Sequence, residues 1–152
     1  MLIGAAIKNY KVYKNLQYIP ISSGFEFSAF LGPNGIGKTS IFEALDKFFN
    51  GGEWVINNES KKITDASAFI APLFLIPIDL INLSKKEKRI ASILSNYFWN
   101  YSDLSYNQFI EHFKNDVSAL SRKGLGANSH YLIMLGQTHQ TNEIHIPHFE
   151  KK

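Results

Sequence analysis

The segment from Phe30 to Leu45, "FLGPNGIGKTSIFEAL", constrains the fold of this chain more than any other part of it. Its residues Gly32–Thr39 fit the pattern G-x-x-x-x-G-K-[ST] at every fixed position. Glycines let backbone N–H groups turn inward around an anion, where side chains would clash. A helix that begins beside the lysine adds free N–H donors and the positive end of its dipole. The segment therefore predicts a phosphate-binding loop between a strand and a helix.

The residues on both sides of this loop have the periodicity that such a context requires. Residues 25–31 alternate in hydrophobicity, and Phe30 on the other face predicts a central strand. From Lys38 the period becomes helical, and Asn50–Gly52 ends the helix. The residues expected to face inward are Ile41, Phe42, Leu45, Phe48 and Phe49. This context favours a ligand-binding loop over a glycine-rich turn that binds nothing.

The longer string "GPNGIGKTSIFEAL" resembles the Walker A region of ABC-type ATPases, especially the RecF/SMC-like and OLD-like members of the AAA family. The opening "IKNYKVYKNLQYIPI" resembles the first hairpin of the same family. Together the two motifs cover about residues 1–52. The resemblance implies an α/β P-loop NTPase fold, an ABC-ATPase-like N-terminal lobe with a mixed sheet and flanking helices.

The resemblance also implies the ligands, ATP and Mg²⁺, and assigns residues to them. Lys38 would act on the outer phosphates as a catalytic residue, and Thr39 would be the Mg²⁺ ligand. Residues 9–13 would lie near the adenine. Gln137 is the candidate for the Q-loop glutamine, which senses Mg²⁺ and the attacking water; Gln140 is the second candidate, and the alternative is that both are hairpin turn residues. The residues expected at the nucleotide phosphates are Asn34, Gly35, Ile36, Gly37, Lys38, Thr39 and Ser40.

Other motifs of complete ABC-type enzymes are not recognisable in the sequence. No segment resembles the signature motif "LSGGQ", and "LSRKGLG" at residues 120–126 follows a predicted helix instead of preceding one. The apolar run Leu73–Asp79 ends in an acid, but Leu80 stands where a glutamate should follow. We therefore expect an incomplete ATP-binding lobe whose hydrolysis requires a C-terminal lobe or a partner. By resemblance, the partner is a second copy, a nuclease or DNA, in DNA repair or anti-phage defence.

Two alternatives to this interpretation remain open. The chain is a complete small P-loop NTPase or kinase that uses Asp79 for Mg²⁺, or it is a non-catalytic interaction module. A GTPase is disfavoured, because no Asn-Lys-x-Asp motif for guanine is present.

The remaining sequence predicts one domain, 1–152, in four parts: 1–52, 53–83, 84–122 and 123–152. Strands are expected at 2–8 and 16–21, and extended chain at 67–80 after a surface loop at 53–66. The string Ser84-Lys-Lys-Glu87 is a capping box that opens a helix. Its expected inward residues are Ile90, Ile93, Leu94, Tyr97, Phe98 and Tyr101. A second helix is expected at 105–121, with Phe109, Ile110, Phe113, Val117 and Leu120 inward, and two strands joined near Thr141 follow.

Composition restricts the setting and the partners of the chain. It has no cysteine, which excludes disulfides and thiolate metal sites and suits a reducing compartment. The N-terminus lacks the features of a secretory signal, and the apolar stretch 68–83 is too short and too interrupted to span a membrane. A cytoplasmic protein without a membrane partner is the expectation. Net charge is +3 with only two arginines, which favours nucleic acid weakly.

Two further groups of residues suggest functions that we do not favour. His139, His145 and His148 lie near Glu143, but positions 145 and 148 point to opposite faces of a strand, so a solvated hairpin is preferred to a metal site. Trp99 falls off the apolar stripe of its helix and is expected to contact a partner.

Overall fold

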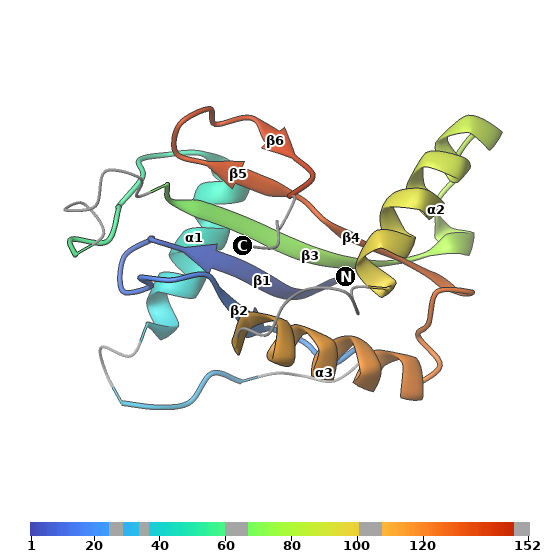
Figure 1. Cartoon of the computed structure of the whole chain (residues 1–152), viewed down its shortest axis with the longest axis horizontal. Coiled ribbons are helices and arrows are strands. Elements are labelled where there is room, and N and C mark those ends of the chain that lie inside the picture. Colours follow the sequence, from blue (N-terminus) through green and yellow to red (C-terminus); the bar gives the residue numbers. More distant parts are fainter. Residues whose placement is uncertain (25–28, 34–36, 60–66, 101–107, 148–152) are drawn as a thin grey trace.

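The computed structural model describes residues 1–24, 29–33, 37–59, 67–100 and 108–147, with the backbone alone for 108–110. Its described part is a six-stranded sheet with helices on both faces (Figure 1). Helix α1 lies on one face, whereas α2 contacts β4 and α3 contacts β2 on the other. Among the described residues, no helix is long and apolar enough to cross a membrane.

The elements follow one another in a defined order along the chain. The strands are β1 (Leu2–Lys8), β2 (Gln17–Pro20), β3 (Phe69–Pro77), β4 (His130–Met134), β5 (Gly136–Thr138) and β6 (Ile144–His145). The helices are α1 (Lys38–Asn50), the 3-10 turn η2 (Ile78–Leu80), α2 (Lys85–Trp99) and α3 (Gln108–Arg122). The strand order is β2-β1-β3-β5-β6, and β4 also pairs with β3. Every described pair is antiparallel, so the expected mixed sheet is wrong for the strands that the structure describes.

Strand β3 is central, and its Pro72 explains how a proline fits there. The strand pairs with β1 along one edge and with β4 and then β5 along the other. The carbonyl of Pro72 accepts a hydrogen bond from the N–H of Leu135 over 3.1 Å. Leu135 lies between β4 and β5, where the neighbouring ladder is interrupted. Proline has no N–H to donate to a neighbouring strand. On this side of β3 the neighbouring ladder is interrupted, so the missing donor breaks no regular pairing.

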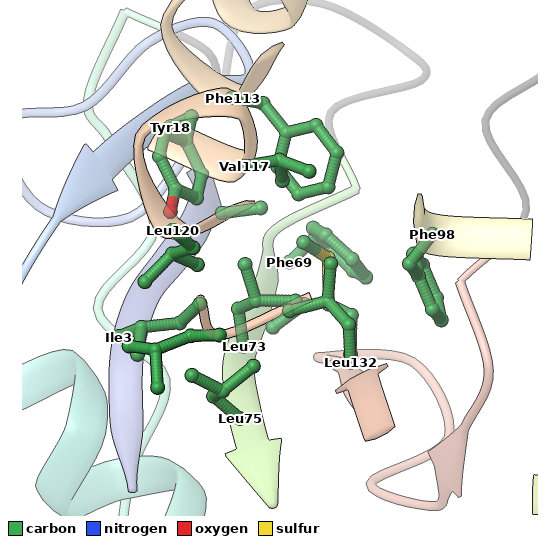
Figure 2. Close-up of a cluster of buried hydrophobic side chains, with 14 residues drawn as sticks. Ile3, Tyr18, Phe69, Leu73, Leu75, Phe98, Phe113, Val117, Leu120 and Leu132 are labelled. Atoms are coloured by element: carbon green, nitrogen blue, oxygen red, sulfur yellow. The ribbon is translucent and has the colours of Figure 1, made fainter. Parts of the chain in front are cut away.

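The larger core lies between the sheet and helices α2 and α3. Figure 2 shows Phe98 entering it from α2, and Phe113 and Val117 from α3 beside Tyr18. The rings of Tyr18 and Phe113 meet edge to face at 5.4 Å, a favoured aromatic geometry. The helix 108–122 thus presents the predicted residues Phe113, Val117 and Leu120 to the core.

The smaller core lies between α1 and the opposite face of the sheet. It contains Ile41, Ala44 and Phe48 of the helix. Helix α1 begins at Lys38 as predicted, and Gly51 ends it with a φ of 82° and a hydrogen bond to Lys47 O. Phe42 and Phe49, which were expected inward, are 56% and 55% exposed. The buried stripe is therefore rotated from the predicted one and runs through Ile41, Ala44 and Phe48.

The structure corrects three other predictions about elements. Residues 29–31 are not in a strand, and Leu31 is 88% exposed, while 25–28 lie outside the described residues. The segment 130–145 forms three strands instead of two. Trp99, which was expected to contact a partner, is partly buried against the larger core, and its indole donates to His130 O over 3.2 Å.

Helix α2 confirms its predicted start but not its predicted face. The hydroxyl of Ser84 accepts from Glu87 N, and the Glu87 carboxylate accepts from Ser84 N, which is the capping box. The fully buried residues of the helix are Ser95 and Phe98, whereas Ile93 is 61% exposed. The buried hydroxyl of Ser95 has a partner, since it accepts a hydrogen bond from Leu132 N of β4 over 2.9 Å.

Candidate functional site

The glycine-rich loop leads into α1 at Gly37, the first residue described after the gap. Gly37 is the N-cap and has a left-handed conformation, with φ 97° and ψ 6°. It accepts the first helical hydrogen bond, from Ile41 N over 3.2 Å, and no side chain caps the helix. The N–H groups of the first turn therefore have no intrahelical partner and no capping side chain. Asn34, Gly35 and Ile36 lie outside the described residues.

The side chain of Lys38 folds back over the loop from which it emerges. Its Nζ donates to Pro33 O over 2.8 Å and also to Gly32 O. The ammonium is thus held beside the backbone that the sequence predicts to surround a phosphate. This arrangement places a positive charge and the positive end of the α1 dipole together.

The hydroxyl residues that follow Lys38 differ in their exposure. Thr39 is exposed at the start of α1, so its hydroxyl is accessible to a ligand, whereas Ser40 is buried. One turn further on, the Glu43 carboxylate pairs with Lys11 Nζ at 2.5 Å. Of the two predicted hydroxyl contacts, Thr39 is therefore the more accessible.

Residues 9–13 lie against the beginning of α1. The Tyr13 hydroxyl donates to Gly37 O over 3.2 Å, and the Tyr10 hydroxyl donates to Glu43 O over 3.4 Å. Burial raises the pKa of both hydroxyls, and the charges of Glu43 and Asp46 add to the effect for Tyr10. Sequence reasoning assigned this segment to the adenine and missed its contact with Gly37. The two tyrosines at 10 and 13, which follow the Asn9 turn, are the signal that was available.

The same segment is fixed from its other side by the residues after α1. Lys11 N donates to Val55 O over 2.8 Å, and Asn57 Nδ2 donates to Lys11 O over 2.6 Å. Asn9 and Lys11 have φ values of 52° and 50°, a left-handed backbone that non-glycine residues adopt rarely. These bonds hold an unfavourable backbone shape in place.

Gln137 lies in β5 opposite Ile70, on the sheet face that carries α1. Its Nε2 donates to Asn142 O over 2.7 Å, and its buried Oε1 has no hydrogen-bond partner. Asn142 Oδ1 accepts from the Trp54 indole, which stands after the C-terminal end of α1. The described contacts therefore join Gln137 to the end of α1 that is remote from Lys38. Its role as a Q-loop glutamine stays a prediction.

Asp79 is exposed in η2, directly after the end of β3. The opposite end of that strand, Phe69, pairs with Lys8, from which the chain continues to Tyr13. The strand has nine residues, so its two ends lie about 26 Å apart at ~3.3 Å per residue. This position gives no support to Asp79 as the magnesium-linked acid of the loop.

The histidines are engaged in structural contacts. His139 Nδ1 accepts from Ala68 N over 3.0 Å, and His145 Nδ1 lies 3.3 Å from Glu143 O. No group of three metal-ligating side chains occurs in the part of the chain that the structure describes. His148 lies outside that part.

The described residues fit a magnesium nucleotide at the loop in three respects. The first turn of α1 offers uncapped N–H donors, Lys38 offers an ammonium, and the exposed Thr39 offers a hydroxyl. A Cβ at Gly37 would lie 2.7 Å from a Val12 methyl, so only glycine fits this turn. Bound Mg²⁺ would neutralise charge on the outer phosphates, and Thr39 would be its protein ligand.

Comparison with known proteins identifies the family to which this site belongs. No curated protein and no solved structure matches the chain. The match to a family covers residues 1–144, nearly the whole sequence, and includes the loop, α1 and all six strands except the last residue of β6. The chain therefore belongs to the AAA ATPase domain family of nucleotide-binding ATPases.

Proposed function

We propose that the chain binds Mg-ATP through Gly37, Lys38, Thr39 and the residues 34–36 that precede them. In this proposal it is the ATP-binding lobe of a RecF/SMC/OLD-like ATPase, and hydrolysis is completed by a C-terminal lobe or by a partner. The observation that carries the proposal is the position of Lys38. Its ammonium lies over the carbonyls of the glycine loop at the uncapped start of α1.

Calorimetric titration with Mg-ATP tests the proposal directly. Lys38→Ala removes the cation that would meet the outer phosphates and is expected to weaken ATP affinity by about tenfold or more, because charge-assisted bonds are the strong ones. Lys88→Ala is the matched control, since Lys88 is exposed on α2, which lies on the opposite face of the sheet from α1. Wild-type protein that neither binds ATP nor gains thermal stability at millimolar Mg-ATP would favour the non-catalytic module.

The proposed context extends beyond binding. By family resemblance the lobe dimerises with ATP and serves DNA repair or anti-phage defence, with a nuclease or DNA as partner, in the cytoplasm. The isolated 152-residue chain is expected to hydrolyse ATP negligibly. Robust turnover that is abolished by Lys38→Ala would contradict the need for a second lobe.

The second candidate is a small P-loop NTPase or kinase that uses Asp79. Asp79→Asn tests it, because loss of turnover with an unchanged melting temperature would assign the carboxylate a role in catalysis. Unchanged turnover would remove this candidate.

A further inference from the structure

The segment Tyr10–Tyr13, which we call the clasp, contacts the first two turns of α1 through several of its residues. Tyr13 reaches Gly37, Lys11 reaches the Glu43 carboxylate, and Tyr10 reaches the Glu43 carbonyl. Its own backbone is tied to Val55 and Asn57 after the helix. The clasp therefore joins the first two turns of α1 to the segment that follows the helix.

Tyr13 makes the contact that matters most for the glycine loop. The residue is only 8% exposed, and its hydroxyl donates to the carbonyl of Gly37, the residue whose left-handed backbone begins α1. The neighbouring Val12 closes the same turn, since its Cγ2 lies 2.7 Å from the position that a Cβ of Gly37 would take. Burial raises the pKa of the Tyr13 hydroxyl, which keeps it protonated and able to donate.

This geometry leaves the Tyr13 ring no free face with which to stack on a base. A stacking residue presents its ring to the ligand, whereas the ring of Tyr13 belongs to the core beside Ile41 and Tyr10. The orientation of the first N–H groups of α1 depends on the backbone of Gly37, to which Tyr13 is bonded. The side chain thus acts on the phosphates only through the loop.

We infer that Tyr13 is a positioning residue that fixes the Gly37 turn of the phosphate-binding loop, and that its hydroxyl sets affinity for the phosphates and not for the base. The inference rests on the proposed function, since it concerns the same loop. It assigns the clasp a role that differs from the adenine contact expected of residues 9–13.

Two probes separate the roles: Mg-ATP, and magnesium tripolyphosphate, which has no base. Each is titrated calorimetrically into wild type, Tyr13→Phe and Tyr18→Phe, and the melting temperature of each free protein is recorded. Tyr18→Phe is the matched control, because it also removes a buried hydroxyl, one that bonds Asp116 on the far face of the sheet. Because Tyr13→Phe loses the hydroxyl contact with Gly37, we expect it to bind both probes about fivefold more weakly than wild type. Tyr18→Phe should lower the melting temperature and leave both affinities unchanged.

The outcomes are distinguishable from one another and from failure of the proposed function. Equal affinities of Tyr13→Phe and wild type overturn the inference, and so does a loss for ATP alone, because that is the result of a base contact. Wild type that binds neither probe refutes the proposed function instead.

Discussion

The hydroxyl of Tyr18 donates a hydrogen bond to Asp116 Oδ2 over 2.8 Å and so joins β2 to α3. Burial raises the pKa of Asp116, although the bond from Tyr18 and the charges of His112 and Lys123 act in the opposite direction. A raised pKa means that the folded state holds the proton more readily than the unfolded state. The associated stability is present below the ordinary value near 3.8 and is lost as the pH rises above it.

Asp116→Asn should therefore remove this loss of stability as the pH rises above the ordinary value near 3.8. An asparagine oxygen still accepts from Tyr18, while the cost of a half-buried charge disappears. We expect a gain at pH 7 of less than about 1 kcal/mol, because solvent still screens the site in part. Denaturant unfolding across this pH range measures it, with Glu111→Gln on the exposed side of α3 as control. Lower stability of Asp116→Asn at pH 7 would show that the carboxylate is favourable.

Gly4 in β1 lies directly against the same tyrosine. A Cβ at this position would lie 2.2 Å from the Tyr18 hydroxyl oxygen and 2.6 Å from its ring carbon Cζ. Because Tyr18 is fixed by Asp116 and by Phe113, it cannot move aside freely. Gly4→Ala should cost about 1–3 kcal/mol of unfolding free energy, as overpacked cores do.

Gly126→Ala is the control for this substitution, because nothing lies within 4 Å of its added Cβ and its φ is not positive. Thermal unfolding of the two variants should separate them clearly. Equal melting temperatures would mean that Tyr18 adopts another position at little cost.

Local sequence signals predicted the elements whose formation depends on local interactions. The capping box fixed the start of α2, and Asn50–Gly52 fixed the end of α1. The buried face of α2 was not predictable in this way. Hydrophobic periodicity places Ile90, Ile93, Leu94, Tyr97 and Phe98 in one stripe, but of these only Phe98 is buried, and Ser95 is buried beside the stripe. The buried side includes Ser95, whose hydroxyl accepts from a backbone N–H of β4, a contact between residues far apart in sequence.

The site shows the same division between local and distant information. The glycine spacing and the Lys38 position follow from eight consecutive residues, and α1 begins where they predict. The clasp contact of Tyr13 joins residues 24 positions apart and requires the fold of the first hairpin. Likewise, only the pairing of β5 with β3 shows that Gln137 reaches Asn142 and the Trp54 side of α1.

The face of α2 can be tested by truncating one residue from each side of it. Phe98→Ala should cost about 3–5 kcal/mol, because Phe98 is fully buried in the larger core. Ile93→Ala, on the same helix, should change the unfolding free energy by less than about 0.5 kcal/mol, since the side chain is exposed. Urea unfolding of both variants measures the difference. A large loss of unfolding free energy in Ile93→Ala would mean that Ile93 faces the core, as hydrophobic periodicity predicted.

Gln137 offers the last test, because its Oε1 is buried without a donor while its Nε2 faces the carbonyl of Asn142. Gln137→Glu would place a second acceptor against that carbonyl and bury a charge, at a cost of about 2–4 kcal/mol at pH 7. Protonation restores a donor, so the loss should shrink near pH 4. Gln137→Leu removes the unpartnered oxygen together with one hydrogen bond and should change stability by less than about 1 kcal/mol.

Gln140→Glu provides the matched control for the charge, since Gln140 is exposed three residues later in the same hairpin. Thermal melts of the three variants at pH 7 and pH 4 give the comparison. If Gln137→Glu is as stable at pH 7 as wild type, its surroundings accommodate an anion. That result would indicate that this end of α1 can take part in ligand binding, and it would support Gln137 as the candidate that senses Mg²⁺. If only Gln137→Glu is destabilised, and only at pH 7, the glutamine is part of the packing between the β5–β6 hairpin and α1.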